Sequence, residues 1–226
     1  MRGTILRTLV STRSVIVLFG AMLIAIALVA LAIGVATKKA DAATTVVTKT
    51  FNKPAQILIP DGQNLNSCAN GITSGVAHPY PSTRRVTSFN QGEILDVNLT
   101  LRNYTHTFPD DVDVLLAHRG INRTVMSDAG GAFDVNDINL TLDQEATTLM
   151  PDETQLEGGR VRPNNFDGLD SFPDLPFSEN GFAALTGFDG ANPNGTWRLY
   201  VQDDSGGDCG EFGGGWTLRI KARVTV

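Results

Sequence analysis

The chain contains 226 residues and has a formal net charge of -6, from 18 lysine and arginine residues and 24 aspartate and glutamate residues. The first 42 residues contain five of the basic residues and one acidic residue, which leaves 13 basic and 23 acidic residues and a net charge of -10 in the remaining 184. This acidic remainder argues against a protein held to nucleic acid by phosphate contacts, and two cysteines exclude both a disulfide-rich miniprotein and a zinc site of four thiolates.

The N-terminal segment predicts export. Arg2, Arg7 and Arg13 precede an uninterrupted apolar run over residues 15–36, which is long enough to cross the roughly 30 Å hydrocarbon layer as a helix. The basic flank should stay in the cytoplasm, which sends the rest of the chain outside. Residues 40–42 read Ala-Asp-Ala, a pattern that signal peptidases cut. A cleaved signal peptide and a retained membrane anchor both stay open, and each makes the remaining chain extracellular or cell-surface.

Residues 43–226 show the period of two that is typical of antiparallel strands with one face on a core. The pattern is clearest at the C-terminus, where apolar residues from Trp216 onward alternate with polar residues. Glycine- and asparagine-rich turn sequences separate the segments. We therefore expect one all-β domain over residues 43–226, a jelly-roll-like antiparallel β-sandwich preceded by an N-terminal signal or transmembrane helix. The segments that alternate are residues 95–102, 112–116, 138–142, 197–202 and 216–226.

Two stretches depart from the alternation. Leu115 occupies a position where a polar residue would continue the pattern, which indicates burial on both faces of the strand or a sheet edge under a loop. Residues 150–187 contain four prolines and predict a long surface excursion rather than a second domain, because proline interrupts regular strands.

The C-terminal stretch NPNGTWRLYVQDDSGGDCGEFGGGWTLRI, residues 192–220, closely resembles the closing strands of the P domain (P/Homo B domain) of subtilisin-like proprotein convertases, in its bacterial stand-alone type. Two further stretches resemble the same family, HPYPSTRRV at residues 78–86 and HTFPDDVDVLLAHRGINRTVMSDAGG at residues 106–131, so the resemblance covers about residues 50–226. The chain departs from the family pattern at Glu211 and Gly213, at the entry to the last strand. The family positions of the closing strands are filled by Gly195, Trp197, Leu199, Val201, Asp203, Trp216 and Leu218. We expect both tryptophans in the core rather than stacked on a ligand.

The resemblance implies an association with serine endopeptidases, but the chain has no nucleophile turn and no catalytic aspartate or histidine block. We therefore expect an exported, non-catalytic binding or structural module. The alternative is an accessory, stabilising subunit of a separate subtilisin-like protease, with that protease or a cell-surface component as partner. This alternative needs an exposed apolar patch. The excursion could supply the patch or could cap the sandwich with the same residues, Phe166, Phe172, Leu175, Phe177 and Phe182.

Acidic residues gather in three loop segments. Calcium takes six to eight oxygen ligands, which exported loops rich in aspartate, asparagine and glycine can supply. The competing interpretation is that these residues are solvated turns that keep an exported protein dispersed. The candidate calcium ligands are Asp110, Asp111, Asp113, Asp128, Asp203 and Asp204.

Cys68 and Cys209 are the only cysteines, and both lie in loop-like sequence rather than at core-facing strand positions. An exported pair is normally oxidised, and two thiols without a nearby paired cysteine or histidine do not form a zinc site. We expect a Cys68–Cys209 disulfide that joins the loop after the first strand to the loop before the last. It would close a loop of about 140 residues and stabilise the chain by about 4–5 kcal/mol in the chain-entropy description, less any strain.

Non-reducing peptide mapping of the native protein is expected to yield one cross-linked peptide that contains Cys68 and Cys209. Reduction should lower the melting temperature and leave the β-rich circular dichroism, because the core does not depend on the bond. Two alkylatable thiols in the native protein would contradict this expectation.

Overall fold

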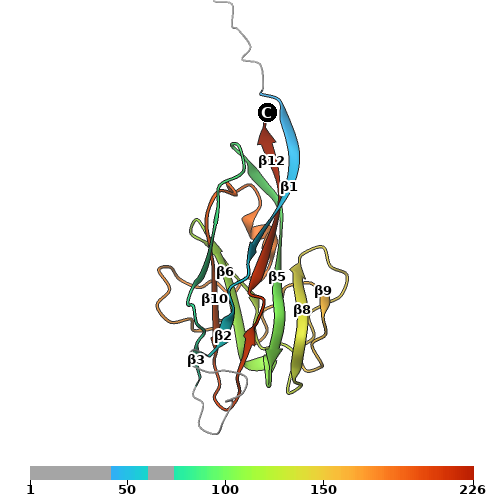
Figure 1. Ribbon diagram of the computed structural model, residues 1–226, viewed down its shortest axis with the longest axis vertical. Helices are drawn as coiled ribbons and strands as arrows, with labels where there is room; N and C mark the ends of the chain where they lie inside the picture. Colours follow the sequence, from blue (N-terminus) through green and yellow to red (C-terminus); the bar gives the residue numbers. More distant parts are fainter. Residues whose placement is uncertain (1–41, 61–73) are drawn as a thin grey trace, which may run out of the picture. The chain divides into compact units, whose positions relative to one another are not determined.

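The computed structural model describes residues 42–60 and 74–226, which form two β-sheets packed face to face (Figure 1). Over those residues the chain has twelve strands and two short 3₁₀ helices. Ala42–Val226 form one compact unit. The predicted N-terminal helix over residues 15–36 lies outside the described residues. In the described part of the chain, no helix is long and apolar enough to cross a bilayer.

The first sheet has seven strands, with β5 at its centre. Strands β12 and β11 pair with successive parts of one edge of β5, and β8 pairs with the opposite edge. Strands β1, β2 and β9 lie beyond β12, β11 and β8, and every pairing is antiparallel except that of β8 with β9. The bounds are β1 Thr44–Lys53, β2 Ile57–Ile59, β5 Glu93–His106, β8 Val135–Asp143, β9 Gly159–Val161, β11 Gly210–Phe212 and β12 Trp216–Thr225.

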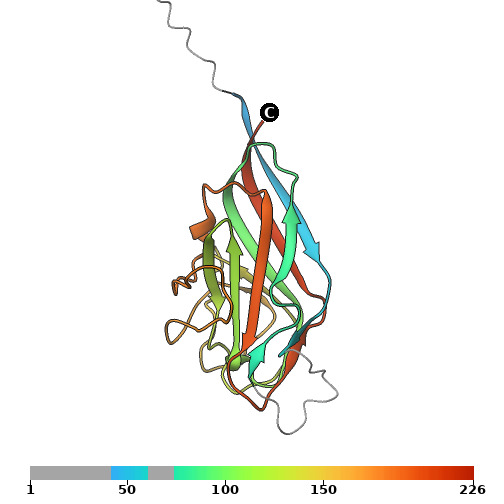
Figure 2. The same ribbon diagram turned by 90° about the vertical axis from the view of Figure 1, so that its left-hand side faces the viewer.

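The second sheet has five strands, with β10 at its centre. Strand β6 pairs with one edge of β10, strands β3 and β4 pair with the other, and β7 lies beyond β6. Figure 2 shows β10 between β4 and β6. The bounds are β3 Gly75–Val76, β4 Ser82–Val86, β6 Val112–His118, β7 Ile121–Met126 and β10 Gly195–Asp203, and the 3₁₀ helices are η1 Pro109–Asp111 and η2 Leu185–Phe188.

The all-β class predicted from the alternation is confirmed. Strands β5, β6, β8, β10 and β12 coincide with the five alternating segments. Their apolar residues meet between the sheets, where Leu99 and Leu218 from the first sheet and Leu116 and Leu199 from the second are fully buried. Burial of this continuous apolar layer supplies the main favourable term for folding.

Both tryptophans are core residues, as expected, with no exposed surface. The Nε1–H of Trp216 donates to Ser82 Oγ at 2.9 Å, and that of Trp197 donates to the Pro193 carbonyl at 3.0 Å. The ring of Trp197 also stacks on His118, with 4.1 Å between the ring centroids. The two indoles therefore join residues far apart in the sequence and satisfy their N–H groups within the core.

The part of the excursion that follows β9 covers the outer face of the second sheet. Phe172 is buried in a cluster with Leu115, Ala117 and Tyr200, and Leu175 and Phe177 pack against the same cluster. All residues of β6 are therefore buried, which confirms burial on both faces as the reason for Leu115. Of the five apolar residues named for a patch or a cap, only Phe182 is strongly exposed, at 64%.

Replacing Ser82 with alanine is expected to lower the free energy of unfolding by about 1–3 kcal/mol, because the buried Nε1–H of Trp216 loses its acceptor. Thr83→Ala is the matched control on the same strand. Thr83 is exposed, so its loss should change the free energy of unfolding by no more than about 0.5 kcal/mol. Urea unfolding followed by tryptophan fluorescence measures both. Equal effects of the two changes would refute this role of Ser82.

Candidate metal centre

Three segments that are distant in the sequence bring carboxylates together. Asp113 is the second residue of β6, and Asp128 follows the end of β7. The pairing of Val114 with Met126 lays the start of β6 beside the end of β7, so the two aspartates become neighbours. The third carboxylate, Asp170, comes from the excursion two residues before the buried Phe172. Packing of the excursion therefore completes the cluster.

Each of these three aspartates has a carboxylate oxygen within 4.8 Å of an oxygen of the other two. Ser127 lies between Asp128 and Asp170, with its hydroxyl 2.5 Å from Asp128 Oδ2 and 3.0 Å from Asp170 Oδ1. A hydroxyl has one proton to donate, so it cannot satisfy both carboxylates together. Asp128 adopts a positive φ of 49°, a conformation in which aspartate is enriched among non-glycine residues.

Asp113 is the most enclosed member of the cluster, with 1% of its surface exposed. Gln202 Nε2 donates to its Oδ2 at 2.8 Å. Within the described residues, Asp113 Oδ1 and Asp170 Oδ2 are buried without a hydrogen-bond partner. An unpaired buried polar atom costs about 1–3 kcal/mol, and more when it carries charge. A positively charged group is one kind of partner that could satisfy such oxygens.

The electrostatics of the cluster agree with this interpretation. Burial, followed by the nearby charge of Asp170, raises the pKa of Asp113 from 3.8 to about 8. Burial raises the pKa of Asp170 to about 6, with Asp128 and Glu179 among the groups that add to the shift. Without a cation, ionising Asp113 at neutral pH is therefore unfavourable. A bound cation would reverse that preference.

The donor set fits calcium. Calcium binds carboxylate, carbonyl and water oxygens at about 2.3–2.6 Å, so two oxygens on one ion lie no more than about 5 Å apart. The 4.8 Å limit that holds for the three aspartates satisfies this condition. Asp113, Asp128 and Asp170 would hold the ion, and backbone carbonyls or water would complete six to eight ligands.

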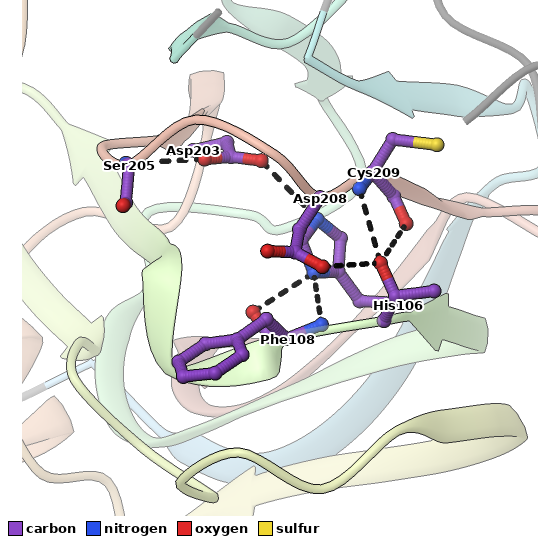
Figure 3. A network of polar contacts seen from close by, with 7 residues as sticks. His106, Phe108, Asp203, Ser205, Asp208 and Cys209 are labelled. Atoms are coloured by element: carbon purple, nitrogen blue, oxygen red, sulfur yellow. Dashed lines mark hydrogen bonds and ion pairs between the residues drawn. The ribbon is translucent and has the colours of Figure 1, made fainter. Parts of the chain in front are cut away.

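The remaining predicted ligands divide into two groups. Asp110 and Asp204 border the cluster, because the charge of Asp128 contributes to the raised pKa of each after the larger effect of burial. Asp203 belongs to a second group around His106 (Figure 3). Asp111 interacts electrostatically with both residues of that pair. Burial, followed by the charges of Asp203 and Asp204, raises the pKa of Asp111 to about 7.

The group around His106 joins the loop after β5 to the loop between β10 and β11 (Figure 3). His106 Nε2 lies 3.4 Å from Asp203 Oδ2, and both side chains are fully buried. His106 Nδ1 lies 2.9 Å from the Phe108 carbonyl oxygen. Thr107 Oγ1 donates to Asp208 Oδ1 at 2.9 Å and accepts from the Cys209 N–H at 3.3 Å. These contacts fix the His106 ring and link the two loops to each other.

Cys209 differs from its predicted setting in one respect. The sequence suggests a loop position away from the core, whereas the residue is fully buried directly before β11. Pairing of β11 with both β2 and β5 encloses it. Cys209 is not a free thiol, but Cys68 lies outside the described residues, so the Cys68–Cys209 bond stays a prediction.

Asp170 and Ser127 are site residues that the sequence pattern does not reveal. Asp170 lies in the proline-rich excursion, far in the sequence from the other acidic loops, and no spacing connects it to them. The only available signal is the apolar residues that follow it, which require the excursion to return to the sheet. Ser127 precedes Asp128 and is fully buried, which its sequence context does not indicate.

Comparison with known proteins gives no relative for this chain: no family model, curated protein or solved structure matches it. The likeness to the P domain therefore remains a hypothesis that rests on the motifs quoted above.

In the presence of EDTA, the protein is expected to be less stable at about pH 8 than at about pH 5. The folded-state pKa of Asp113 lies above its unfolded value of 3.8, so the folded state retains a proton that the unfolded state releases, and stability falls as the pH rises through this window. Urea unfolding at both pH values measures the difference. Asp113→Asn should reduce the change in the free energy of unfolding between the two pH values. Asp134→Asn, at an exposed aspartate, should leave that change as it is in the unaltered protein. A rise in wild-type stability between the two pH values would contradict the expectation.

Proposed function

We propose that this chain is an exported, non-catalytic β-sandwich module of the jelly-roll type, similar to P domains, that binds calcium through Asp113, Asp128 and Asp170. One observation carries the proposal. Asp113 is almost fully buried, its Oδ1 has no hydrogen-bond partner among the described residues, and two further carboxylates from separate segments approach the same point. A divalent cation is the partner that this arrangement lacks.

In this proposal calcium has a structural role. It links β6, the turn after β7 and the excursion, which carry Asp113, Asp128 and Asp170 respectively. Without the ion, the packing of Phe172 on the second sheet places Asp128 and Asp170 beside a buried carboxyl group that keeps its proton at neutral pH, because its pKa is raised to about 8. With the ion, binding energy contributes to the stability of the folded excursion, because the unfolded chain has no preformed site.

The contacts of the buried histidines support a non-catalytic module. The two ring nitrogens of His118 contact the backbone carbonyls of Asn192 and Thr196, and burial lowers its pKa. His106 contacts Phe108 and Asp203. The hydroxyl of Ser127, within the acidic cluster, contacts the carboxylates of Asp128 and Asp170. A nucleophilic serine requires a neighbouring general base oriented by a third group, and these contacts instead resemble structural hydrogen bonds.

The alternative role, as an accessory subunit of a subtilisin-like protease, depends on an exposed apolar patch on the excursion. Phe172, Leu175 and Phe177 are instead used within the chain, where they pack on Leu115 and Tyr200. This packing weakens the support for the alternative, because only Phe182 of the five named residues stays strongly exposed, together with Leu169. The calcium-binding module remains the better-supported function.

Calcium added to EDTA-treated protein is expected to raise the melting temperature, because ligand binding to the folded state stabilises it by mass action. Isothermal titration with calcium chloride should give one ion per chain. Asp113→Asn and Asp170→Asn should each weaken calcium binding at least about tenfold, since each removes a charged ligand.

Asp134→Asn is the control, because Asp134 is an exposed aspartate outside the cluster. Its calcium affinity and melting temperatures should match those of the unaltered protein. Superimposable melting curves in EDTA and in calcium, together with no heat of binding, would refute the metal centre.

A further inference from the structure

The solvent-facing side of the first sheet contains a polar groove that is separate from the metal centre. It has a volume of about 680 Å³ and crosses β12, β5, β8 and β9. The same strands direct Leu99, Leu140 and Leu218 into the core on the opposite face. The groove is lined by Leu95, Asp96, Asn98, Thr100, Thr141, Asp143, Glu145, Arg160, Arg219 and Lys221.

Asn98 occupies the middle of the groove. The strand register sets it directly opposite Arg219 on β12 and Asp143 on β8. One position further along the same face, Thr100 pairs with Thr141, and their hydroxyl oxygens lie 2.9 Å apart. Side chains directly opposite each other in a sheet are close enough to touch. The floor of the groove is therefore a continuous row of hydrogen-bonding groups.

Asn98 has an unsatisfied hydrogen-bonding group. Only 7% of the residue is exposed, and its Oδ1 is buried without a hydrogen-bond partner within the described residues. Natural proteins satisfy nearly all buried polar atoms, so an exception calls for an explanation. Since Asn98 lines an open groove, a ligand that enters and exchanges hydrogen bonds with its amide would supply the missing partner.

Four of the six charged groups of the groove are held in ion pairs, Asp143 with Arg160 and Asp96 with Arg219. Asp143 Oδ1 accepts from the Glu145 N–H at 2.9 Å, and its Oδ2 accepts from Arg160 Nε at 2.9 Å. Arg219 forms an ion pair with Asp96 at 3.6 Å. Ordered side chains of this kind lose less conformational freedom when a ligand binds.

The charge balance of the groove limits what it can bind. Its lining has three acidic residues, three basic residues and a single apolar residue, Leu95. An anionic ligand such as a nucleic acid would need an excess of basic groups, and an apolar ligand would need an apolar lining. A neutral molecule rich in hydroxyl groups fits, because each hydroxyl both donates and accepts hydrogen bonds.

We propose that this groove binds a neutral carbohydrate chain. Asn98 and the pair of threonines contact sugar hydroxyls at the floor, Arg219 and Lys221 donate from one side, and the carboxylate of Glu145 accepts from the other. The groove volume falls within the range of about 300–1,000 Å³ that is usual for small-molecule sites, which suits a short oligosaccharide segment.

Isothermal titration of the purified full-length chain with five neutral hexasaccharides tests the proposal. The probes are cellohexaose, xylohexaose, laminarihexaose, maltohexaose and mannohexaose, with a heparin-derived hexasaccharide as the anionic comparison. At least one neutral probe is expected to bind with a Kd between about 10 μM and 1 mM. Arg219→Ala and Asn98→Leu should each weaken that binding at least about tenfold, because the first removes a donor from one side of the groove and the second removes an amide from its floor.

Arg223→Ala is the matched control. Arg223 lies on the same strand, on the same face and in an ion pair with Glu93, but outside the groove, so its loss should leave the affinity unchanged. Melting curves establish that each variant is folded, and Arg219→Ala decides the test if Asn98→Leu does not fold. The proposal is overturned if none of the neutral probes binds at about 5 mM, if both groove variants bind as well as the Arg223→Ala control, or if the anionic probe binds more tightly than every neutral probe.

Discussion

Strand β6 is covered on both faces, and the arrangement of the excursion and of the acidic cluster follows from this. One face, with Val114 and Leu116, contributes to the core between the sheets. The other, with Leu115 and Ala117, must be covered by another part of the chain, because an exposed apolar strip in the middle of a sheet is unfavourable. Phe172 of the excursion covers it. That packing brings Asp170 to Asp113, so one apolar requirement also assembles the acidic cluster.

Burial of Asp113 is unfavourable unless its charge is compensated. Gln202 satisfies one of its oxygens, and the proposed calcium ion would satisfy the other together with Asp128 and Asp170. The outer faces of the two sheets differ in whether another part of the chain covers them. The excursion covers the second sheet, whereas the polar groove of the first sheet contains Asn98 and fixed ion pairs that suit a ligand from outside the chain.

The alternation of apolar and polar residues was sufficient to predict strands β5, β6, β8, β10 and β12, but not β1, most of whose ten residues are exposed. In β12, apolar residues recur at every second position and all of them from Trp216 to Val224 are buried, so the period itself identifies the core face. Short strands were not predictable in this way. β9 has three residues and β3 has two, too few to show a period. They form because their neighbours β8 and β10 offer unpaired edges.

The sequence by itself therefore determined the all-β class, five alternating segments and the burial of both tryptophans. It predicted all the acidic candidates in loops, whereas Asp113 lies in β6 and Asp203 ends β10. Only the tertiary structure decided which of these residues meet. Asp113, Asp128 and Asp170 are brought together by the β6–β7 register and by the packing of Phe172, and Asn98, Asp143 and Arg219 by pairing across three strands. Such contacts depend on strand order and register, which are set by the best burial of the whole apolar surface and leave no local signal in the chain.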